Sequence, residues 1–229
     1  MKTSWLKQVI ITKKNRRACY RIVDSLEPQL RCERKALDQY IDGVLPYKHD
    51  QTTTVSKIVI GERSLVLKRY NSRSFTHKIK RALRQSRADR CWQMSYAFAR
   101  AGLNVAPPVF MYEERLFFIR KYAYFANQYL TGEELLESLP RMEKADQIKV
   151  VEAFKRAMKI MQEYKITHGD MKASNLLWVN NELFFIDLDG ARQHSSMLSW
   201  ARSNKRDRRR FLKNWRENPE VEALFSWLI

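Results

Sequence analysis

The chain has 229 residues, 45% of them hydrophobic, which is enough to bury a core and excludes disorder throughout. Its 43 Lys and Arg against 25 Asp and Glu leave a net charge of +18. This predicts attraction to nucleic acid, an anionic membrane face or a phosphorylated substrate. The three scattered cysteines form no CxxC pair, which argues against a disulfide framework and favours a reducing cytoplasm. No stretch approaches the roughly 18 apolar residues of a membrane span, so we expect membrane contact only from the side.

The first half of the chain reads as strand-rich with one long helix. Residues 8–23 predict two short strands around a polar turn, and residues 29–42 predict a helix. The β-branched, alternating runs of 52–70 flank the sequence GERS and predict a hairpin whose second strand carries Lys68. Residues 75–101 are rich in Arg and Ala, contain no Pro or Gly, and predict a long basic helix.

The second half reads as mainly helical. After a second predicted hairpin over 107–123, Thr131 is expected to cap a short helix, with Glu134 three places on in a capping-box pattern. Over 143–164, apolar residues at steps of three and four predict one face of a helix. These are Ile148, Val151, Phe154, Met158 and Met161. Two short strands then flank the predicted turn Asn180–Asn181.

The strand-rich half gives way to the helical half at a seam near residues 121–127. We therefore predict an N-terminal lobe over residues 1–123, rich in strands and holding the long basic helix. A helical C-terminal lobe over residues 124–229 would carry the most polar loop of the sequence.

That loop lies in THGDMKASNLLW, residues 167–178, and holds the groups that phosphoryl transfer needs. Asp170 is the candidate base, which would orient a hydroxyl and take its proton. Asn175 and Asp187 offer the hard oxygen ligands that Mg²⁺ prefers. Lys68 would hold the nucleotide phosphates, and Lys172 would neutralise charge on the group in transfer.

Structural explanations compete with each of these assignments. An Asp or Asn in a loop is commonly a turn former, and a Lys on a strand is commonly solvated. His168 is expected to be a buried histidine that bonds nearby backbone, with no role in proton transfer. Asp189 competes with Asp187 as a metal ligand, and we favour Asp187 because the apolar run LFFI leads towards it.

The order of these motifs resembles that of protein-kinase-like enzymes. HGDMKASN looks like their H-R-D-x-x-x-x-N catalytic loop, FIDLDG like D-F-G, and LVLK like V-A-I-K. The resemblance implies an α+β, two-lobed protein-kinase-like fold, with a strand-rich N-lobe and a mainly helical, shortened C-lobe. It also implies ATP in a cleft between the lobes, with its adenine near 120–126.

Departures from the protein-kinase pattern narrow the function. Gly169 replaces the Arg of H-R-D. No G-x-G-x-x-G motif precedes Lys68, so residues 48–54 would have to cover the phosphates with Thr hydroxyls and backbone N–H groups. Asp89 is the only acid in 75–101, so a glutamate partner for the strand lysine is not obvious. Only 229 − 190 = 39 residues follow Gly190, without an A-P-E motif. The acceptor is therefore predicted to be a small molecule or a sugar.

Over roughly residues 45–215 the chain is similar to the lipopolysaccharide core sugar kinases, the heptose and 3-deoxy-octulosonate (Kdo) kinases. The segments that carry this similarity are TVSKIVIGERSLVLKRYN, SRADRCWQMSYAFARAGLNVAPPV, ITHGDMKASNLLW, FFIDLDGAR and RDRRRFLKNW. The similarity implies that ATP and Mg²⁺ are used to phosphorylate a sugar hydroxyl of a lipid-linked core oligosaccharide. It also implies a cytoplasmic protein, peripheral on the cytoplasmic face of the inner membrane.

Two basic tracts bear on the partners. One comprises Lys78, Lys80, Arg81, Arg84, Arg87 and Arg90, and the other spans 202–216. They are either solvated helix faces or surfaces that lie near anionic lipid. In the second case, each cation would add about 1 kcal/mol to the free energy of membrane attraction. Alternative functions are a kinase of another small molecule, which would need an acidic pocket for a cationic acceptor, and a pseudokinase or nucleic-acid-binding protein. No RNA-binding motif with interleaved aromatic residues occurs, so nucleic acid is not an expected partner.

Overall fold

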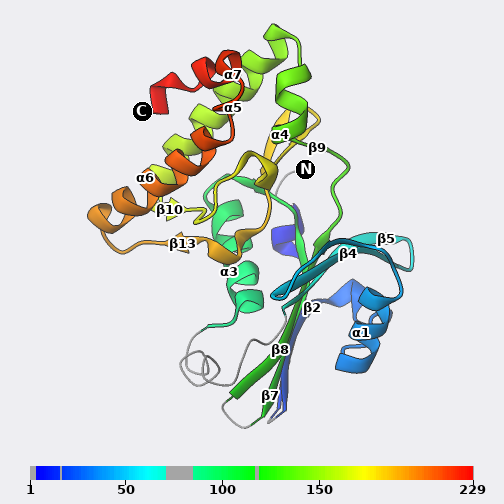
Figure 1. Ribbon diagram of the computed structural model, residues 1–229. Coiled ribbons are helices and arrows are strands. Elements are labelled where there is room, and N and C mark those ends of the chain that lie inside the picture. The colour runs from blue at the N-terminus through cyan, green and yellow to red at the C-terminus, as the bar shows by residue number, and fades with distance from the viewer. Residues whose placement is uncertain (1–3, 16, 71–84, 117–118, 229) are drawn as a thin grey trace. The chain divides into compact units, whose positions relative to one another are not determined.

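The computed structural model describes residues 4–15, 17–70, 85–116 and 119–228 (Figure 1). They form two compact units. The first unit draws on residues 1–93 and 107–129, and the second on residues 94–106 and 130–229. The division into lobes at residues 123 and 124 stays a prediction.

The first unit is built on a seven-stranded antiparallel sheet with the order β1-β2-β7-β8-β5-β4-β3. Its strands are β1 (Ile10–Lys14), β2 (Ala18–Val23), β3 (Pro46–His49), β4 (Thr53–Ile60), β5 (Arg63–Tyr70), β7 (Pro108–Leu116) and β8 (Ile119–Gln128). The three predicted hairpins are therefore present. The turn between β4 and β5 uses Gly61 at φ +58°, a conformation that glycine adopts without a steric penalty.

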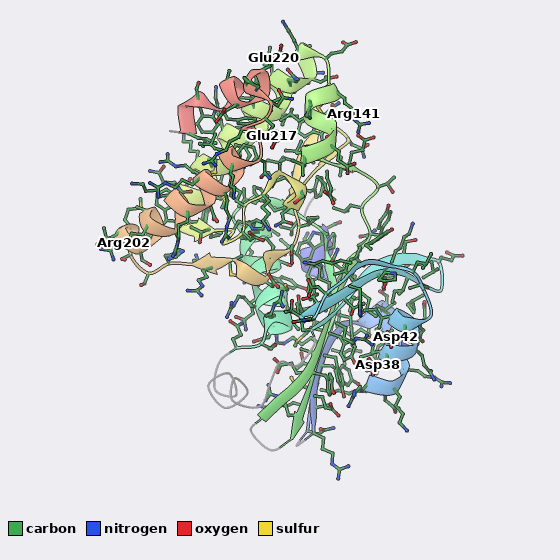
Figure 2. All side chains as sticks on the ribbon, in the orientation of Figure 1. Asp38, Asp42, Arg141, Arg202, Glu217 and Glu220 are labelled. Atoms are coloured by element: carbon green, nitrogen blue, oxygen red, sulfur yellow. The ribbon has the colours of Figure 1, made fainter. Side chains whose placement is uncertain are left out.

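Helix α1 (Arg34–Asp42) packs on β4 and β5 and buries Leu37 and Ile41 in the core of this unit (Figure 1). Asp38 and Asp42, which Figure 2 labels on α1, both accept from Nη1 of Arg69 on β5, at 2.9 and 2.8 Å. The helix begins later than predicted, because the backbone amides of residues 29 and 30 already donate to Leu26 in a preceding turn.

Helix α3 (Arg87–Arg100) is the described part of the predicted basic helix. Residues 75–84 lie outside the described residues, and so do the basic side chains at positions 78 to 84. The first turns of α3 meet the sheet through Asp89, which is ion-paired with Arg21, and through Cys91, whose Sγ lies 3.3 Å from the Tyr70 hydroxyl.

The second unit packs helices α5 and α6 together around an aromatic core (Figure 1). Its helices are α4 (Leu135–Ser138), α5 (Lys144–Glu163), α6 (Met197–Lys213) and α7 (Pro219–Leu224). The ring of Phe154 on α5 stacks on Phe211 of α6 at 4.4 Å between centroids, and Phe225 meets both rings edge-on. None of the described helices is long and apolar enough to cross a bilayer.

Two small sheets complete the second unit. One has the order β6-β12-β11-β9, and the other pairs β10 with β13. Their strands are β6 (Asn104–Val105), β9 (Glu133–Glu134), β10 (Ile166–Thr167), β11 (Leu176–Val179), β12 (Glu182–Phe185) and β13 (Arg192–Gln193). The β11–β12 turn places Asn180 and Asn181 at φ 49° and 62°, the pairing that favours a tight two-residue hairpin.

Two local predictions are wrong. Glu134, rather than Thr131, is the N-cap of α4, because residues 133 and 134 are held extended by pairing with β11. On α5, Val151, Phe154, Met158 and Met161 are buried as predicted. Ile148 is 58% exposed, because it lies in the second turn of the helix before the aromatic core begins.

Candidate active site

The polar loop between β10 and β11 contains a glycine, directly after His168, at a position that admits no side chain. Gly169 has φ +80°, and a Cβ built on it would lie 2.1 Å from the carbonyl oxygen of Gly190. The loop and the segment that follows β12 therefore touch backbone to backbone. This close approach explains why an arginine cannot occupy the position after His168.

Two further hydrogen bonds join the loop to the segment after β12. The buried His168 donates from Nε2 to the carbonyl oxygen of Ile186 at 2.9 Å, which confirms its predicted structural role. The amide of Ile186 donates to the carbonyl oxygen of Asn175 at 3.0 Å. Asp187 thus follows a residue that is bonded to both ends of the loop.

The carboxylate of Asp170 lies between two cations. Arg210 Nη1 is 3.0 Å from its Oδ1, and Lys172 Nζ is 3.3 Å from its Oδ2. All three side chains are partly exposed, so these ion pairs add little stability, and their effect is mainly to orient the carboxylate. The structure therefore brings the predicted base and Lys172 together.

Asn175 is oriented by its own loop. Its amide nitrogen donates to the backbone oxygen of Asp170 at 2.8 Å. This bond uses the nitrogen and fixes the orientation of the amide group, whose oxygen can act as an acceptor or a metal ligand. Asp187 adopts φ 60° and ψ 55°, a left-handed conformation that is rare outside glycine and often marks a functional residue. An amide oxygen and a carboxylate on adjoining segments fit Mg²⁺, which binds hard oxygens and completes its shell with phosphate and water.

Asp189 lies apart from the strand that precedes it. Strand β12 ends at Phe185, and Asp189 sits within a 3-10 turn over Leu188–Gly190. The choice between Asp187 and Asp189 as the metal ligand stays a prediction, and no group of three His, Cys, Asp or Glu side chains suited to a metal occurs among the described residues.

Helix α6 anchors the loop through three side chains, none of which the sequence interpretation identified. The buried Asp207 accepts from the Gly169 amide at 2.9 Å, and Arg210 donates to the Gly169 carbonyl oxygen at 2.6 Å. Asn214, the residue that follows α6, accepts from the Ala173 amide at 3.0 Å. The spacing of three and four residues places these side chains on one helical face. The available signal was a single acid within the basic run RDRRR.

Lys68 belongs to the first unit, whereas the other predicted site residues belong to the second. It lies on β5 opposite Val55 of β4 and Phe125 of β8, and it is only 9% exposed. Burial of an ammonium group on a sheet is costly and needs a reason. Its predicted role in holding phosphates stays a prediction.

The β3–β4 turn, within the predicted phosphate-covering segment 48–54, is closed by Asp50. Its Oδ1 accepts from the Thr52 hydroxyl, from the Thr52 amide and from the Thr53 amide, at 2.7, 2.7 and 2.8 Å. These bonds, led by that from the Thr52 hydroxyl, hold the pKa of the Asp50 carboxyl well below its usual range. The hydroxyl of Thr53 lies 3.1 Å from Arg87 Nη1, so it is already engaged within the unit.

Comparisons with known proteins show which family the sequence matches. The sequence matches the model of the lipopolysaccharide kinase (Kdo/WaaP) family over residues 48–223. A solved structure of WaaP in complex with acyl carrier protein aligns with a TM-score of 0.54 at 18% identity, covering 82% of this chain and 88% of that chain. The likeness confirms the predicted α+β, protein-kinase-like fold. A direct comparison with curated proteins gives no match.

The family match confirms the resemblance seen in the sequence. It extends over the hairpin that carries Lys68, the polar loop with Asp170 and the helix α6 that anchors this loop. A match over this length covers more than half of the chain, and the chain therefore belongs to the lipopolysaccharide kinase (Kdo/WaaP) family.

Proposed function

We propose that this protein transfers the γ-phosphoryl group of ATP to a sugar hydroxyl of the lipopolysaccharide inner core. The observation that carries the proposal is the polar loop of the second unit. In this loop, Asp170 is ion-paired with Arg210 and Lys172 and precedes Asn175 by five residues. Family membership supports a kinase acting on the lipopolysaccharide core. The dependence on ATP and the acceptor hydroxyl are added by the proposal.

In this proposal Asp170 takes the proton from the sugar hydroxyl as the hydroxyl oxygen bonds to the γ-phosphorus, and the bond from the γ-phosphorus to the bridging oxygen of ATP breaks, so that ADP leaves. The carboxylate must then lie within hydrogen-bond reach of the hydroxyl, and its partial exposure leaves room for an acceptor. Lys172, beside the base, neutralises charge on the phosphoryl group in transfer. Lys68 stabilises the negative charge of the α- and β-phosphates.

Asn175 and Asp187 are the residues that would hold Mg²⁺ in this proposal. The chemistry that Mg²⁺ would supply there is neutralisation of the negative charge on the phosphate oxygens. The proposed ligand atoms are the amide oxygen of Asn175 and a carboxylate oxygen of Asp187. Asn175 Nδ2 donates to the backbone oxygen of Asp170, so the amide oxygen is the atom of Asn175 that would face the ion.

The acceptor is proposed to be a lipid-linked core oligosaccharide, which the protein meets at the anionic, cytoplasmic face of the inner membrane. A net charge of +18 supports peripheral attraction to such a surface. Nucleic acid is not a proposed partner.

The test is to incubate the protein with purified lipid-linked core oligosaccharide and Mg-ATP, and to measure the mass of the saccharide. We expect the mass of one added phosphoryl group, and none when Mg²⁺ is removed with a chelator. Asp170→Ala should abolish the transfer, because the variant lacks the proposed base, while binding of ATP is largely retained.

Two results would contradict the proposal. Normal turnover by Asp170→Ala would remove Asp170 as the base. An unchanged saccharide mass with wild-type protein that binds Mg-ATP would remove the core sugar as the acceptor, and would favour a different small-molecule substrate.

A further inference from the structure

Helix α6 carries far more positive charge than its role as an anchor requires. It contains seven Lys and Arg and one acid, Asp207, which is 1% exposed and accepts from the Gly169 amide. Its exposed cations are Arg202, Lys205, Arg206, Arg209, Arg210 and Lys213. Arg202, labelled in Figure 2, points away from the body of the unit. The outer side of the helix therefore presents one sign of charge.

Three of these cations form a row that passes the predicted base. Arg206, Arg210 and Lys213 follow each other at steps of four and three residues, which places them on one side of the helix. We call these three residues the cationic row. Its middle member, Arg210, is the residue whose Nη1 lies 3.0 Å from Asp170 Oδ1.

The cationic row is not explained by the folded chain alone. Within the described ranges, Arg206 and Lys213 have no acidic partner, and Arg206 Nη2 donates to the Ser203 hydroxyl at 2.9 Å. Like charges four residues apart destabilise a helix. The helix dipole favours Lys213 in the last turn, but it does not favour Arg206 near the middle.

We propose that the cationic row binds anionic substituents, phosphate or carboxylate, of the acceptor saccharide beside the hydroxyl that receives the phosphoryl group. This inference rests on the proposed function, because a hydroxyl within reach of Asp170 brings the rest of its sugar close to Arg210 and its neighbours. Arginine presents a planar fork to such oxyanions, and lysine presents a point charge. The acceptor class is thereby narrowed to a saccharide that already carries negative groups.

The test compares the double variant Arg206→Gln/Lys213→Gln with wild type, leaving the Arg210–Asp170 contact in place. The acceptor is lipid-linked core oligosaccharide in micelles of a neutral detergent, used both intact and after phosphatase treatment. We expect the KM for the intact acceptor to rise on the order of tenfold, as loss of charge-assisted bonds predicts. The KM for ATP should stay within about twofold, because the lost binding concerns the acceptor.

A matched control removes the same charges elsewhere. Arg156 and Lys159 are exposed on α5, and Arg156→Gln/Lys159→Gln should leave both KM values unchanged. The charge-retaining variant Arg206→Lys/Lys213→Arg should keep most of the affinity for the acceptor. With phosphatase-treated acceptor, the difference between wild type and Arg206→Gln/Lys213→Gln should shrink.

The inference is overturned if Arg206→Gln/Lys213→Gln keeps the wild-type KM for the intact acceptor in micelles, or if the α5 control raises this KM equally. A KM change that occurs only when the acceptor is embedded in anionic vesicles would assign the row to a lipid surface instead. If wild type phosphorylates no saccharide, the proposed function itself fails, which is a different result from normal transfer with an unchanged KM.

Discussion

Gly169 shows how a single residue can decide the geometry of the polar loop that carries Asp170. Its positive φ and its contact with the backbone of Gly190 leave no space for a Cβ. A departure from the H-R-D pattern is thereby a steric requirement of this chain, because the loop lies directly on the segment that carries Asp187. Sequence alone could note the glycine, but it could not show which backbone lies against it.

We expect Gly169→Ala to destabilise the protein and to disrupt transfer. The new Cβ would meet the Gly190 carbonyl oxygen at 2.1 Å, so the loop must shift, in addition to the strain of an alanine at φ +80°. The free energy of unfolding should fall by about 3 kcal/mol, as for other strongly strained sites. Urea denaturation measures this change.

Gly102 provides a matched control for this variant. It also has a positive φ, +91°, but a Cβ there meets nothing within 4 Å. Gly102→Ala should therefore cost only the conformational strain, about 1 kcal/mol. Equal destabilisation by the two variants would show that contact with Gly190 is not what requires a glycine at position 169.

At the scale of elements, α6 is the support of the polar loop. Its inner face carries the aromatic contact of Phe211 with α5, and also the carboxylate of Asp207, which accepts from the Gly169 amide. The loop is therefore fixed to the hydrophobic core of the unit through one helix. Preorganisation of this kind lets a carboxylate act without the cost of reorganising at the moment of reaction.

Asp207→Ala is expected to lower kcat more than its loss of stability explains. The variant removes the carboxylate that accepts from the Gly169 amide, and a hydrogen bond to a charged group is worth about 1.5–3 kcal/mol. The loop next to Asp170 then loses a fixed position, so kcat measured well below the unfolding temperature should fall at least tenfold, in line with the cost of misplacing catalytic groups.

The conservative variant tests whether Asp207 acts by positioning. Asp207→Asn keeps an oxygen that can accept from the Gly169 amide, so it should recover most of the lost kcat. A variant Asp207→Ala with wild-type kcat, or an Asn variant as impaired as the Ala variant, would contradict a positioning role based on this hydrogen bond.

The elements that could be predicted from the sequence are those fixed by local patterns. Alternation over 52–70 predicted β4 and β5, and the periodic apolar residues of 143–164 predicted α5. Thr131 is not the cap of α4, because the residues between it and the helix are held extended. They pair with β11, which lies more than 40 residues further along the chain. The anchors on α6 were missed for the same reason, since Gly169 and Asp207 are 38 residues apart.

At the scale of the whole molecule, the net charge of +18 favours attraction to anionic surfaces. The charge is spread over the chain, and α6 is one of several elements that carry it. Long-range attraction depends on this total, whereas recognition of a particular saccharide depends on the few cations near Asp170. The two effects can therefore be separated by experiment.

We expect the protein to sediment with vesicles that contain phosphatidylglycerol, and to stay in solution with vesicles of phosphatidylcholine alone. Added salt should release it, because a Debye length of about 3 Å at 1 M screens exposed charges. The variant Arg206→Gln/Lys213→Gln changes the net charge only from +18 to 18 − 2 = +16, so it should retain most of this binding. Equal sedimentation with neutral and anionic vesicles would show that charge does not direct the attraction.

The two sides of α6 have one further consequence. Asp207 and Arg210 hold the polar loop, whereas the other exposed cations of the helix lie outside this set of contacts, so those positions can be exchanged without moving Asp170. A protein engineer could therefore replace these exposed cations with acidic or aromatic side chains, and could ask whether differently substituted sugars then bind beside the proposed base.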